Sequence, residues 1–367
     1  MAQFDSAIVI NNIKYALKLA ELTGKRLAEL TGVHQNTITN IMKSKTQISL
    51  DILKKIAEAV NQPITFFFND NSPKGLLFRA TMDAKLTEKK QFLLLKEFEN
   101  LVFLRDKALN KISVDFPPER KIHSVEINEE VKSQIREIAL NLRKEWNLGL
   151  QPIANIIETA QEHDIFVYPF NDKDSKFKAC SAYDQNNGMI IFFNNNPSII
   201  FEDRIFTIAH ELGHLIFHRE DYKNNPTNLG SRDLREKVCN YFASYFLMPE
   251  HAFNSFVKQN SPLSLDAIKQ FCKIWKFAIK AFFYRLNSDI KEFKTMEWPY
   301  ITNILKQNYK LPNPSFFNKD EEYFEVNTKD KYLGIALRNE SITLSKAKEI
   351  TGYDFDRLIK IKGSVVF

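Results

Sequence analysis

Apolar residues recur at the three- and four-residue spacing of buried helices through much of this 367-residue chain. The spacing predicts helices within residues 22–42, 48–60, 92–112, 205–217, 236–249, 264–285 and 345–350. Pro249 closes one of these segments, because proline cannot donate the backbone hydrogen bond that would continue the helix. The pattern therefore predicts a largely helical chain.

Short apolar runs predict a small sheet among these helices. They occupy residues 165–169, 177–183 and 189–193. Asn186-Asn187-Gly188 separates the last two runs, and an Asn-Gly pair favours the tight turn of a hairpin. The expected fold class is mostly α with a small β-sheet (α+β), with an all-α amino-terminal domain, an α+β central domain and a mainly helical carboxy-terminal domain.

His210, Glu211 and His214 form an HExxH motif inside the apolar run at residues 205–217. Four residues of helix separate the two imidazoles by about 6 Å and place them on one face, where both can reach one metal ion. A core helix that carries these residues by chance is the alternative, but two His and a Glu are costly to bury without a metal. The motif therefore predicts a zinc site, with Glu211 beside it as the general base.

A third protein ligand is needed, because a catalytic zinc ion keeps three protein ligands and one open position. We expect Glu236, which opens the second predicted helix, with Asn240 one turn later as a supporting contact. A solvated acid favoured by the helix dipole is the alternative interpretation of Glu236. His218 is expected to be a structural residue at the helix end, since about 12 Å of straight helix separate it from His210. Weaker candidates for the ligand are Glu202, Glu220 and Asp233.

Two cysteines and two tyrosines lie near this motif in the sequence or in the predicted sheet. Cys239 is expected to be a packed residue rather than a metal ligand. Cys180 is a candidate regulatory thiol that would occupy the open metal position, and a buried structural cysteine is the alternative. Tyr183 and Tyr241 are either donors to the oxyanion or packed aromatics, and the pattern does not choose between these roles.

Composition and charge narrow the class of protein only slightly. The chain is 44% hydrophobic, which is enough for two or three cores, and its net charge of +6 is mild. Its three cysteines form no CxxC pair, which argues against a disulfide framework and favours a reducing compartment. With no secretory pattern and no apolar stretch of membrane length, we expect a cytoplasmic protein without membrane contact.

The first 70 residues carry a second pattern, in which two short helices meet at a glycine. Gly32 supplies the backbone freedom of the turn, and apolar positions on both sides can pack the helices at a steep angle. Amide side chains at the start of the second helix can hydrogen-bond base edges, while Arg26, Lys43 and Lys45 can meet phosphates. The charge of this region supports DNA binding only weakly, because the region holds eight basic and six acidic residues, a net charge of +2.

The central region resembles the ImmA/IrrE-type metallopeptidases over about residues 125–260. The likeness rests on Ala-His-Glu-Leu-Gly-His at 209–214, Glu-x-x-Cys-Asn-x-Phe-Ala at 236–243 and Leu-Met-Pro at 247–249. Residues 136–153 also resemble the helix and Pro-Ile segment that open the peptidase domain of that family. The resemblance implies a zincin-like α+β domain and a cytoplasmic endopeptidase with Zn²⁺ as cofactor, which acts on a transcriptional repressor.

Residues 8–68 resemble the phage-repressor (XRE/Cro-type) helix-turn-helix. The side chains that this resemblance places in the major groove of double-stranded DNA are Gln35, Asn36, Thr39 and Asn40. Gly24 departs from the family pattern, which usually has a Gln there that contacts the DNA backbone. A helix-turn-helix used for protein contact alone is the alternative.

The expected organisation has four parts. They are a helix-turn-helix domain at residues 1–70, a linker with a long helix at 71–124, a peptidase domain at 125–260 and a helical domain of unassigned role at 261–367. The long helix is apolar enough to hold a homodimer together, or to pack on the peptidase domain of its own chain.

The sequence thus predicts a DNA-binding regulator and zinc endopeptidase that cleaves a partner transcriptional repressor on a stress, prophage or defence signal. The competing interpretation is a non-proteolytic transcription factor, or an antitoxin-like interaction protein, with a structural metal. The intact Glu211 favours the enzyme, because structural zinc sites close all four positions with protein ligands.

Overall fold

The computed structural model of the protein describes residues 6–20, 22–44, 46, 48–60, 62, 64–68, 79–80, 88–110, 117–122, 124, 126–173, 177–184, 187–219, 232–290, 324 and 327–364. The chain divides into two compact units, Met1–Leu76 with Lys85–Glu99, and Leu77–Ala84 with Asn100–Phe367. Each unit has a hydrophobic core of its own.

The first unit begins with four helices and a short 3-10 helix. They are α1 (Ser6–Leu19), α2 (Gly24–Thr31), α3 (Gln35–Met42), α4 (Leu50–Ala59) and η1 (Ile64–Phe67). The Thr23 hydroxyl accepts from the backbone N–H of Arg26 at 3.2 Å, which caps α2. Gly32 ends α2 with a φ of 65°, in the left-handed region that favours glycine. The predicted pair of helices joined at Gly32 is confirmed.

Aliphatic and aromatic side chains from α1, α2, α3, α4 and η1 fill the core of this first unit. Its most deeply buried members are Ile13, Ala16, Leu27, Ile38, Ile41, Leu53, Ile56 and Phe67. Asn12 donates from Nδ2 to the carbonyl oxygens of Phe66 and Phe67 at 3.2 and 3.1 Å, which ties η1 to α1. The core thus fixes α3 with its polar side chains on the outside.

The second unit is built on a sheet whose described strands have the order β1-β3-β4-β2. These strands are β1 (Arg79–Ala80), β2 (Ile165–Phe170), β3 (Ala179–Asp184) and β4 (Gly188–Asn194). β3 is antiparallel to both β1 and β4, whereas β2 and β4 are parallel. Three strands match the predicted ones to within two residues at either end, and β1 was not predicted. At the turn before β4, Asn187 donates its N–H to Asp184 Oδ1 at 2.7 Å, while Asn186 lies outside the described residues.

Helices make up most of the rest of the described chain. They are α5 (Glu88–Leu109), α6 (Glu129–Glu145), α7 (Ile156–Glu162), α8 (Phe201–Phe217), α10 (Arg232–Leu247), α11 (Glu250–Gln259), α12 (Leu265–Trp275), α13 (Ile279–Asp289), α15 (Thr328–Arg338), α16 (Leu344–Thr351) and α17 (Phe355–Gly363). The expected fold class, mostly α with a small sheet, is confirmed. Both helices of the predicted metal site start four residues before the predicted position, because their first turns are largely polar.

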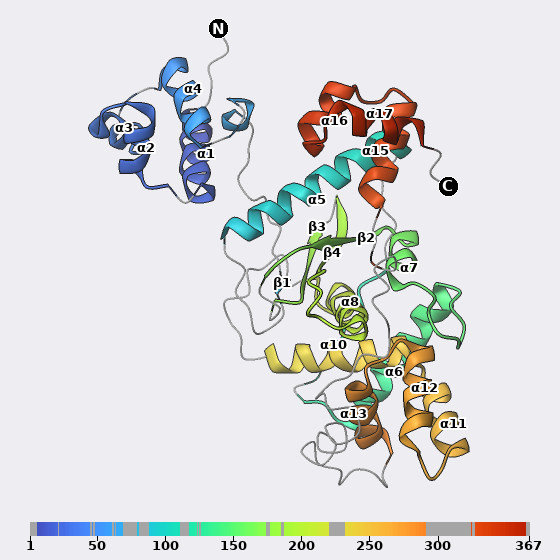
Figure 1. Ribbon diagram of the computed structural model, residues 1–367. Helices are drawn as coiled ribbons and strands as arrows, with labels where there is room; N and C mark the ends of the chain where they lie inside the picture. The colour runs from blue at the N-terminus through green and yellow to red at the C-terminus, as the bar shows by residue number, and fades with distance from the viewer. Residues whose placement is uncertain are drawn as a thin grey trace. The chain divides into compact units, whose positions relative to one another are not determined.

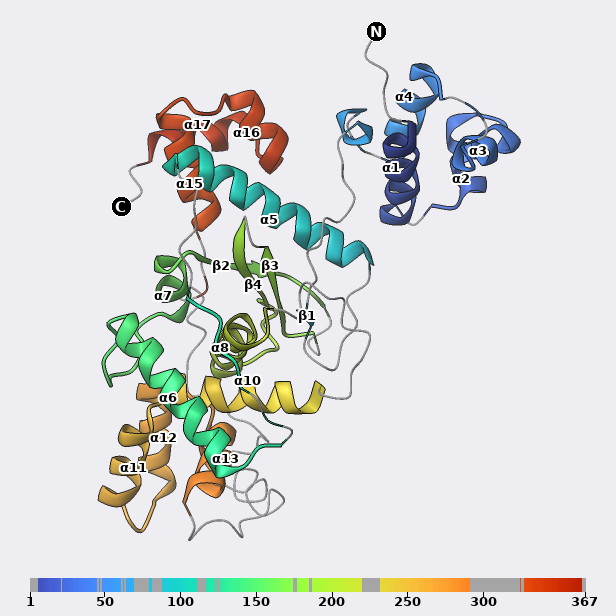
Figure 2. The ribbon, with the colours of Figure 1, turned by 180° about the vertical axis from the view of Figure 1, so that it is seen from behind.

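The sheet lies between α8 on one face and the second half of α5 on the other (Figures 1 and 2). Ile165 and Val167 point to the face that α8 covers and share its core. On the opposite face, the guanidinium of Arg105 lies 5.4 Å from the centre of the Phe166 ring and donates to the carbonyl of Asn187 at 3.1 Å. From Asn100 onward, α5 therefore packs on the second unit of its own chain.

The same half of α5 also packs against α15, α16 and α17. Leu104 and Ala108 share a buried cluster with residues of α15, α16 and α17, and Asn100 donates to the carbonyl of Ile350 at 3.3 Å. Packing within the chain was one of the two interpretations of this helix, and a homodimer contact stays a prediction.

Two buried arginines fix α10, the helix that carries Glu236. Arg143 on α6 donates to the carbonyls of Gly149, Gln151 and Phe246, and its burial lowers the pKa of its guanidinium to about 10. Arg285 on α13 donates to the Ser244 hydroxyl at 3.1 Å. These bonds satisfy the carbonyls of the loop after α6 and hold the C-terminal parts of α6 and α13 against the C-terminal part of α10.

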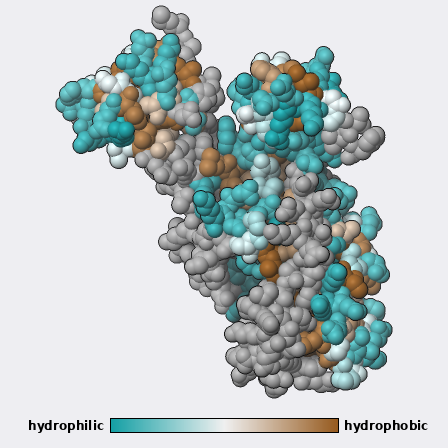
Figure 3. Space-filling view, viewed as in Figure 1, coloured by the Kyte–Doolittle hydropathy of each residue, from teal (hydrophilic) through white to brown (hydrophobic). Residues whose placement is uncertain are grey.

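Hydrophilic residues cover most of the described surface in Figure 3, with hydrophobic residues in smaller patches among them. Among the described helices, none is both long and apolar enough to cross a membrane.

Candidate metal centre and DNA-facing helix

The close crossing of α8 and α10 brings the predicted ligands together. At Gly213 a side-chain Cβ would lie 3.1 Å from Phe242 Cδ1 and 3.3 Å from Cys239 Cα, so the glycine allows the two helices to approach. Phe217 packs edge-on against Phe242 with ring centres 5.4 Å apart. The second helix of the predicted metal site therefore packs on the first.

Three side chains converge at this crossing. His210, His214 and Glu236 are all buried, and their ligand atoms lie within 4.8 Å of one another. Glu236 Oε2 lies 3.0 Å from His210 Nε2, Glu236 Oε1 lies 3.4 Å from His214 Nε2, and the two Nε2 atoms are 3.1 Å apart. Ligand atoms about 2.1 Å from a tetrahedral zinc ion lie roughly 3.4 Å from one another. The three groups therefore fit a tetrahedral cation in chemistry and in spacing.

The outer nitrogen of each imidazole is also engaged. Asn240 Oδ1 lies 2.9 Å from His210 Nδ1, so it can accept the proton on Nδ1 and leave the lone pair of Nε2 directed toward Glu236. At His214, Nδ1 lies 3.1 Å from Cys239 Sγ. Asn240 therefore contacts one of the proposed ligands, and its supporting role stays a prediction.

The environment of Glu236 favours its charged form. Burial opposes ionisation, but the adjacent His210 and His214 side chains outweigh it and lower the pKa of the Glu236 carboxyl below its usual value. The weaker candidates are not part of this group: Glu202 is buried elsewhere on α8, and Glu220 and the side chain of Asp233 lie outside the described residues.

His218 and Cys239 form a second, adjoining group with the outer side of His214. His218 Nδ1 lies 3.2 Å from His214 Nδ1 and 3.6 Å from Cys239 Sγ. His218 is the residue at which α8 ends, and its N–H donates to the carbonyl of His214. Cys239 is fully buried against α8. Both residues contact the far nitrogen of His214, and neither is in the His210–His214–Glu236 group.

Glu211 is fully buried beside the two histidines and faces the sheet. Its Oε2 accepts a hydrogen bond from the hydroxyl of Ser181 on β3 at 2.5 Å. Sequence reasoning missed Ser181. The alternation of β3 was the available signal, because residues 179, 181 and 183 of this strand point to one face.

The helix-turn-helix residues gather on the outside of α3. Gln35, Asn36, Thr39 and Asn40 are exposed, as is Lys43 at the end of the helix, whereas Ile38 and Ile41 on the other side are buried. The hydroxyl of Thr39 donates to the carbonyl of Gln35 at 2.9 Å. Arg26 is exposed and pairs with Glu29 at 2.8 Å, and Lys45 lies outside the described residues.

Comparison with protein families finds two matching regions of the chain. Residues 13–67 match a family model described as helix-turn-helix, and residues 160–281 match a peptidase family model described as the IrrE N-terminal-like domain. The chain joins a helix-turn-helix domain to an IrrE-like peptidase domain. The second match includes α8 and α10. No curated protein matched the chain in the search.

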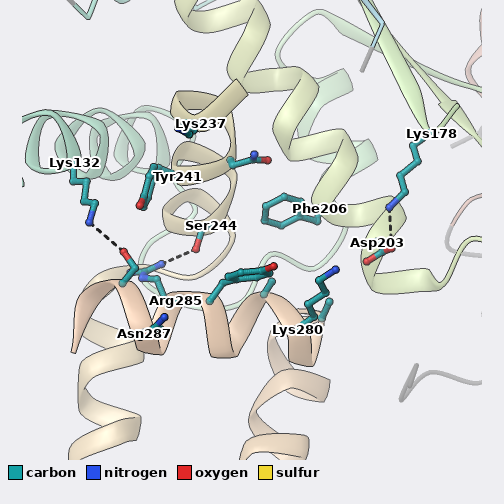
Figure 4. A pocket seen from close by; sticks show the side chains of 15 residues that line it. Lys132, Lys178, Asp203, Phe206, Lys237, Tyr241, Ser244, Lys280, Arg285 and Asn287 are labelled. Atoms are coloured by element: carbon teal, nitrogen blue, oxygen red, sulfur yellow. Dashed lines mark hydrogen bonds and ion pairs between the residues drawn. The ribbon is translucent and has the colours of Figure 1, made fainter. Parts of the chain in front are cut away.

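Beside the metal-ligand group, the second unit has a cavity of about 850 Å³ between α6, α8, α10 and α13 (Figure 4). Asn240 lines it, together with the aromatic side chains of Phe206, Tyr241 and Tyr284. The charged residues that line it are Lys132, Lys178, Lys237, Lys280, Arg285 and Asp203. Basic residues predominate in this lining, which favours acidic groups in a ligand.

Several contacts link the charged residues around the cavity. Lys178 pairs with Asp203 at 3.0 Å, and Lys132 contacts Ser288 at 3.3 Å (Figure 4). The Tyr241 ring lies 5.2 Å from Lys132 Nζ. Tyr241 thus lies in the cavity wall, and its predicted alternative role at an oxyanion stays a prediction.

Cys180 lies in β3 directly before Ser181, so its side chain points away from the face that carries Ser181. It is fully buried, and burial raises the pKa of its thiol well above the usual value, with the charge of Glu211 adding to the effect. A regulatory thiol needs the thiolate and access to the metal. Both observations favour a structural cysteine, and the regulatory role stays an untested prediction.

Proposed function

We propose that this chain is a zinc-dependent endopeptidase with Glu211 as its general base and His210, His214 and Glu236 as the metal ligands. The main support for this proposal is that two imidazole nitrogens and one carboxylate lie 3.0 to 3.4 Å from one another in a buried site. The match to a peptidase family over residues 160–281 supports the same reaction class. Zinc is the expected ion, because two His and one Glu are a common ligand set of catalytic zinc.

When bound, a zinc ion would act as a Lewis acid that polarises the carbonyl of a peptide bond. Glu211 takes a proton from the attacking water, whose oxygen adds to the carbonyl carbon. The same carboxyl returns the proton to the leaving amine as the C–N bond breaks. Ser181 donates to Glu211 Oε2, which holds the carboxylate in one orientation for both transfers.

The three ligands are held by the contacts around them. Asn240 fixes the ring of His210, and the crossing at Gly213 fixes the distance between α8 and α10. Both contacts restrict the ligands to one geometry before metal arrives, which lowers the ordering cost of binding.

We further propose that the helix-turn-helix reads double-stranded DNA through the exposed face of α3, and that the peptidase cuts a transcriptional repressor on a stress, prophage or defence signal in the cytoplasm. DNA binding is supported by the exposed polar side chains on α3, the second helix of the pair. These are Gln35, Asn36, Thr39 and Asn40. The proposed substrate rests on the family resemblance, which pairs peptidases of this type with repressors.

Co-expression of the chain with candidate repressors tests the enzymatic proposal. A fragment of the repressor is expected with the wild-type chain and none with Glu211→Gln, which keeps the shape of the side chain but cannot accept the proton. The matched control is Glu250→Gln, an exposed acid on α11. Fragments of equal yield with wild type and Glu211→Gln would remove Glu211 from its assigned role. A chain that binds metal and cuts none of the repressors would favour the non-proteolytic transcription factor.

A further inference from the structure

The last three helices of the chain, α15, α16 and α17 (Figure 1), repeat the helix-turn-helix of the first unit. One constant shift along the sequence takes Gly32 to Gly352. The same shift places α16 on α2, residue for residue, and starts α17 where α3 starts. It also brings α15 within the bounds of α1. The spacing of the three helices is therefore the same in both parts of the chain.

The turn between the two short helices is also the same. Gly32 and Gly352 have φ values of 65° and 71°, in the left-handed region that favours glycine. The threonine before each glycine donates its hydroxyl at 2.7 Å to the backbone carbonyl four residues earlier. Its hydroxyl oxygen accepts the N–H of the residue after the glycine, at 3.3 Å in α2 and at 3.1 Å in α16. A threonine hydroxyl caps the start of both helices, with N–H donors at 3.2 Å.

Equivalent positions are buried in the two segments. The buried pairs are Ile13 and Leu333, Ala16 and Ala336, Leu17 and Leu337, Leu27 and Ala347, Ile38 and Leu358, and Ile41 and Ile361. Side chains of α4 and η1 complete the first core, whereas Leu104 and Ala108 of α5 complete the second. Because the same positions face inward, the same positions of α3 and α17 face outward. Residues 328–363 therefore form a second helix-turn-helix.

The outer face of α17 is exposed at the positions where α3 carries its amides. The equivalents of Gln35, Asn36, Thr39 and Asn40 are Phe355, Asp356, Ile359 and Lys360, and all of them are exposed. Phe355 and Ile359 are large apolar side chains with exposed fractions of 44% and 57%. Base edges offer a partner to each group: the thymine methyl to an apolar side chain, the cytosine amino group to a carboxylate, and the guanine acceptors to a lysine.

The two pairs of short helices carry the same net charge. Residues 24–43 hold three basic and one acidic residue, and residues 344–363 hold five basic and three acidic residues, so both are at +2. Lys346, Lys348 and Lys362 are exposed and can meet phosphates. Lys346 pairs with Glu349 at 2.9 Å, at the positions where Arg26 and Glu29 pair at 2.8 Å. Charge and exposed chemistry together favour duplex DNA as the ligand.

We propose that α17 is a second reading helix, so that the chain recognises two separate sequence elements in double-stranded DNA, one through α3 and one through α17. The class of ligand rests on the proposed DNA reading by α3. The second site lies outside the helix-turn-helix match at residues 13–67. Since the side chains at equivalent positions differ, the element that α17 reads differs in sequence from the element that α3 reads.

Selection of duplexes from a random library tests this proposal with the full chain. Two elements are expected in the duplexes that the wild-type chain selects. Phe355→Ala with Lys360→Ala should select only one of them and bind the wild-type duplex at least about tenfold more weakly. The matched control is Ile274→Ala with Lys258→Ala, which removes an exposed apolar and an exposed basic side chain from α12 and α11. The control should select both elements.

The variants of the two reading helices separate this inference from the proposed role of α3. Gln35→Ala with Asn36→Ala should lose the other element and keep the one that α17 reads. If the α17 variant selects the same duplexes as wild type, with equal affinity, the second site is overturned. If the α3 variant does so instead, the proposed role of α3 is overturned. A chain that selects no duplex would contradict both.

Photo-crosslinking identifies what contacts α17. A benzophenone amino acid would replace Phe355 in one chain and Ile274 in a control chain, and each chain would be irradiated with the selected duplex. A crosslink to DNA is expected from position 355 and none from position 274, because only the first is on the proposed reading face. Crosslinks from position 355 to a second copy of the chain and none to DNA would identify a protein-contact surface and overturn the proposal.

Discussion

His210 has both ring nitrogens engaged, one by Glu236 and one by Asn240. The contact at Nδ1 selects the tautomer whose Nε2 lone pair faces the other ligands. Without Asn240, the His210 ring would rotate more freely and its Nδ1 would form hydrogen bonds with other groups. The ligand set therefore depends on a side chain that does not itself reach the metal position.

Asn240→Ala is expected to weaken zinc affinity by about 10- to 100-fold, the usual cost of losing a partner of a ligating histidine. Competition against a chromophoric chelator measures the zinc affinity of each chain. Asn260→Ala, which removes an amide bonded to the carbonyl of Phe256, is the matched control. Equal zinc affinity in wild type and Asn240→Ala would show that Asn240 does not orient His210.

The three cysteines are all buried, and none of them forms a disulfide. Burial raises the pKa of the thiols of Cys180 and Cys272, which suppresses their thiolates at neutral pH. We expect a thiol reagent such as Ellman's reagent to react with none of the three in the native chain at pH 7.5 and with all three after unfolding. Rapid labelling of Cys180 in the native chain would reverse this conclusion and restore its candidacy as a regulatory thiol.

At the scale of elements, the site depends on how closely α8 and α10 cross. Gly213→Ala would place a Cβ 3.1 Å from Phe242 Cδ1 and 3.3 Å from the Cys239 backbone, so the helices must separate slightly. We expect a loss of about 1 to 3 kcal/mol in the free energy of unfolding, as for overpacked cores, and weaker zinc binding. Urea unfolding measures the change in the free energy of unfolding. Gly363→Ala, where an added Cβ meets nothing within 4 Å, is the control. Unchanged stability would mean that the crossing tolerates the added methyl group.

A separate prediction concerns the exposed face of α3. Gln35→Ala with Asn36→Ala should lower affinity for a duplex selected from a random library and relax its sequence preference, because base contacts carry specificity. Lys43→Ala should instead reduce the slope of log affinity against log salt by about one, because a phosphate contact is lost. Gel-shift titrations over a range of salt concentrations distinguish these effects. Unaltered binding by both variants would favour a helix-turn-helix used for protein contact.

Sequence periodicity was sufficient for the elements with long apolar patterns and insufficient for those that depend on remote partners. The strands at 165–170 and 188–194 are apolar runs, and their positions follow from the sequence within a residue or two. β1 has only two residues, and its strand conformation depends on pairing with β3, about 100 residues later in the chain. No local pattern encodes such a pairing.

The same contrast holds within the site. The spacing of His210 and His214 implies their shared face, because helix geometry fixes it. Ser181 could be assigned to one face of its strand, but its contact with Glu211 depends on how α8 lies across the sheet. The contacts of His214 with Cys239 and His218 likewise require the crossing of α8 and α10.

At the scale of the whole molecule, a helix-turn-helix and a peptidase domain share one chain, and the linker between them contributes β1 to the sheet of the peptidase unit.

The zinc content of the purified chain, measured by mass spectrometry after growth with added zinc, tests the central claim most directly. About one zinc ion per chain is expected in wild type and in Glu211→Gln. The ion should be largely lost from His210→Ala and His214→Ala, and retained in His251→Ala, which removes an exposed histidine on α11 outside the ligand group. A wild-type chain without metal, or a His210→Ala chain with its full zinc content, would contradict the account.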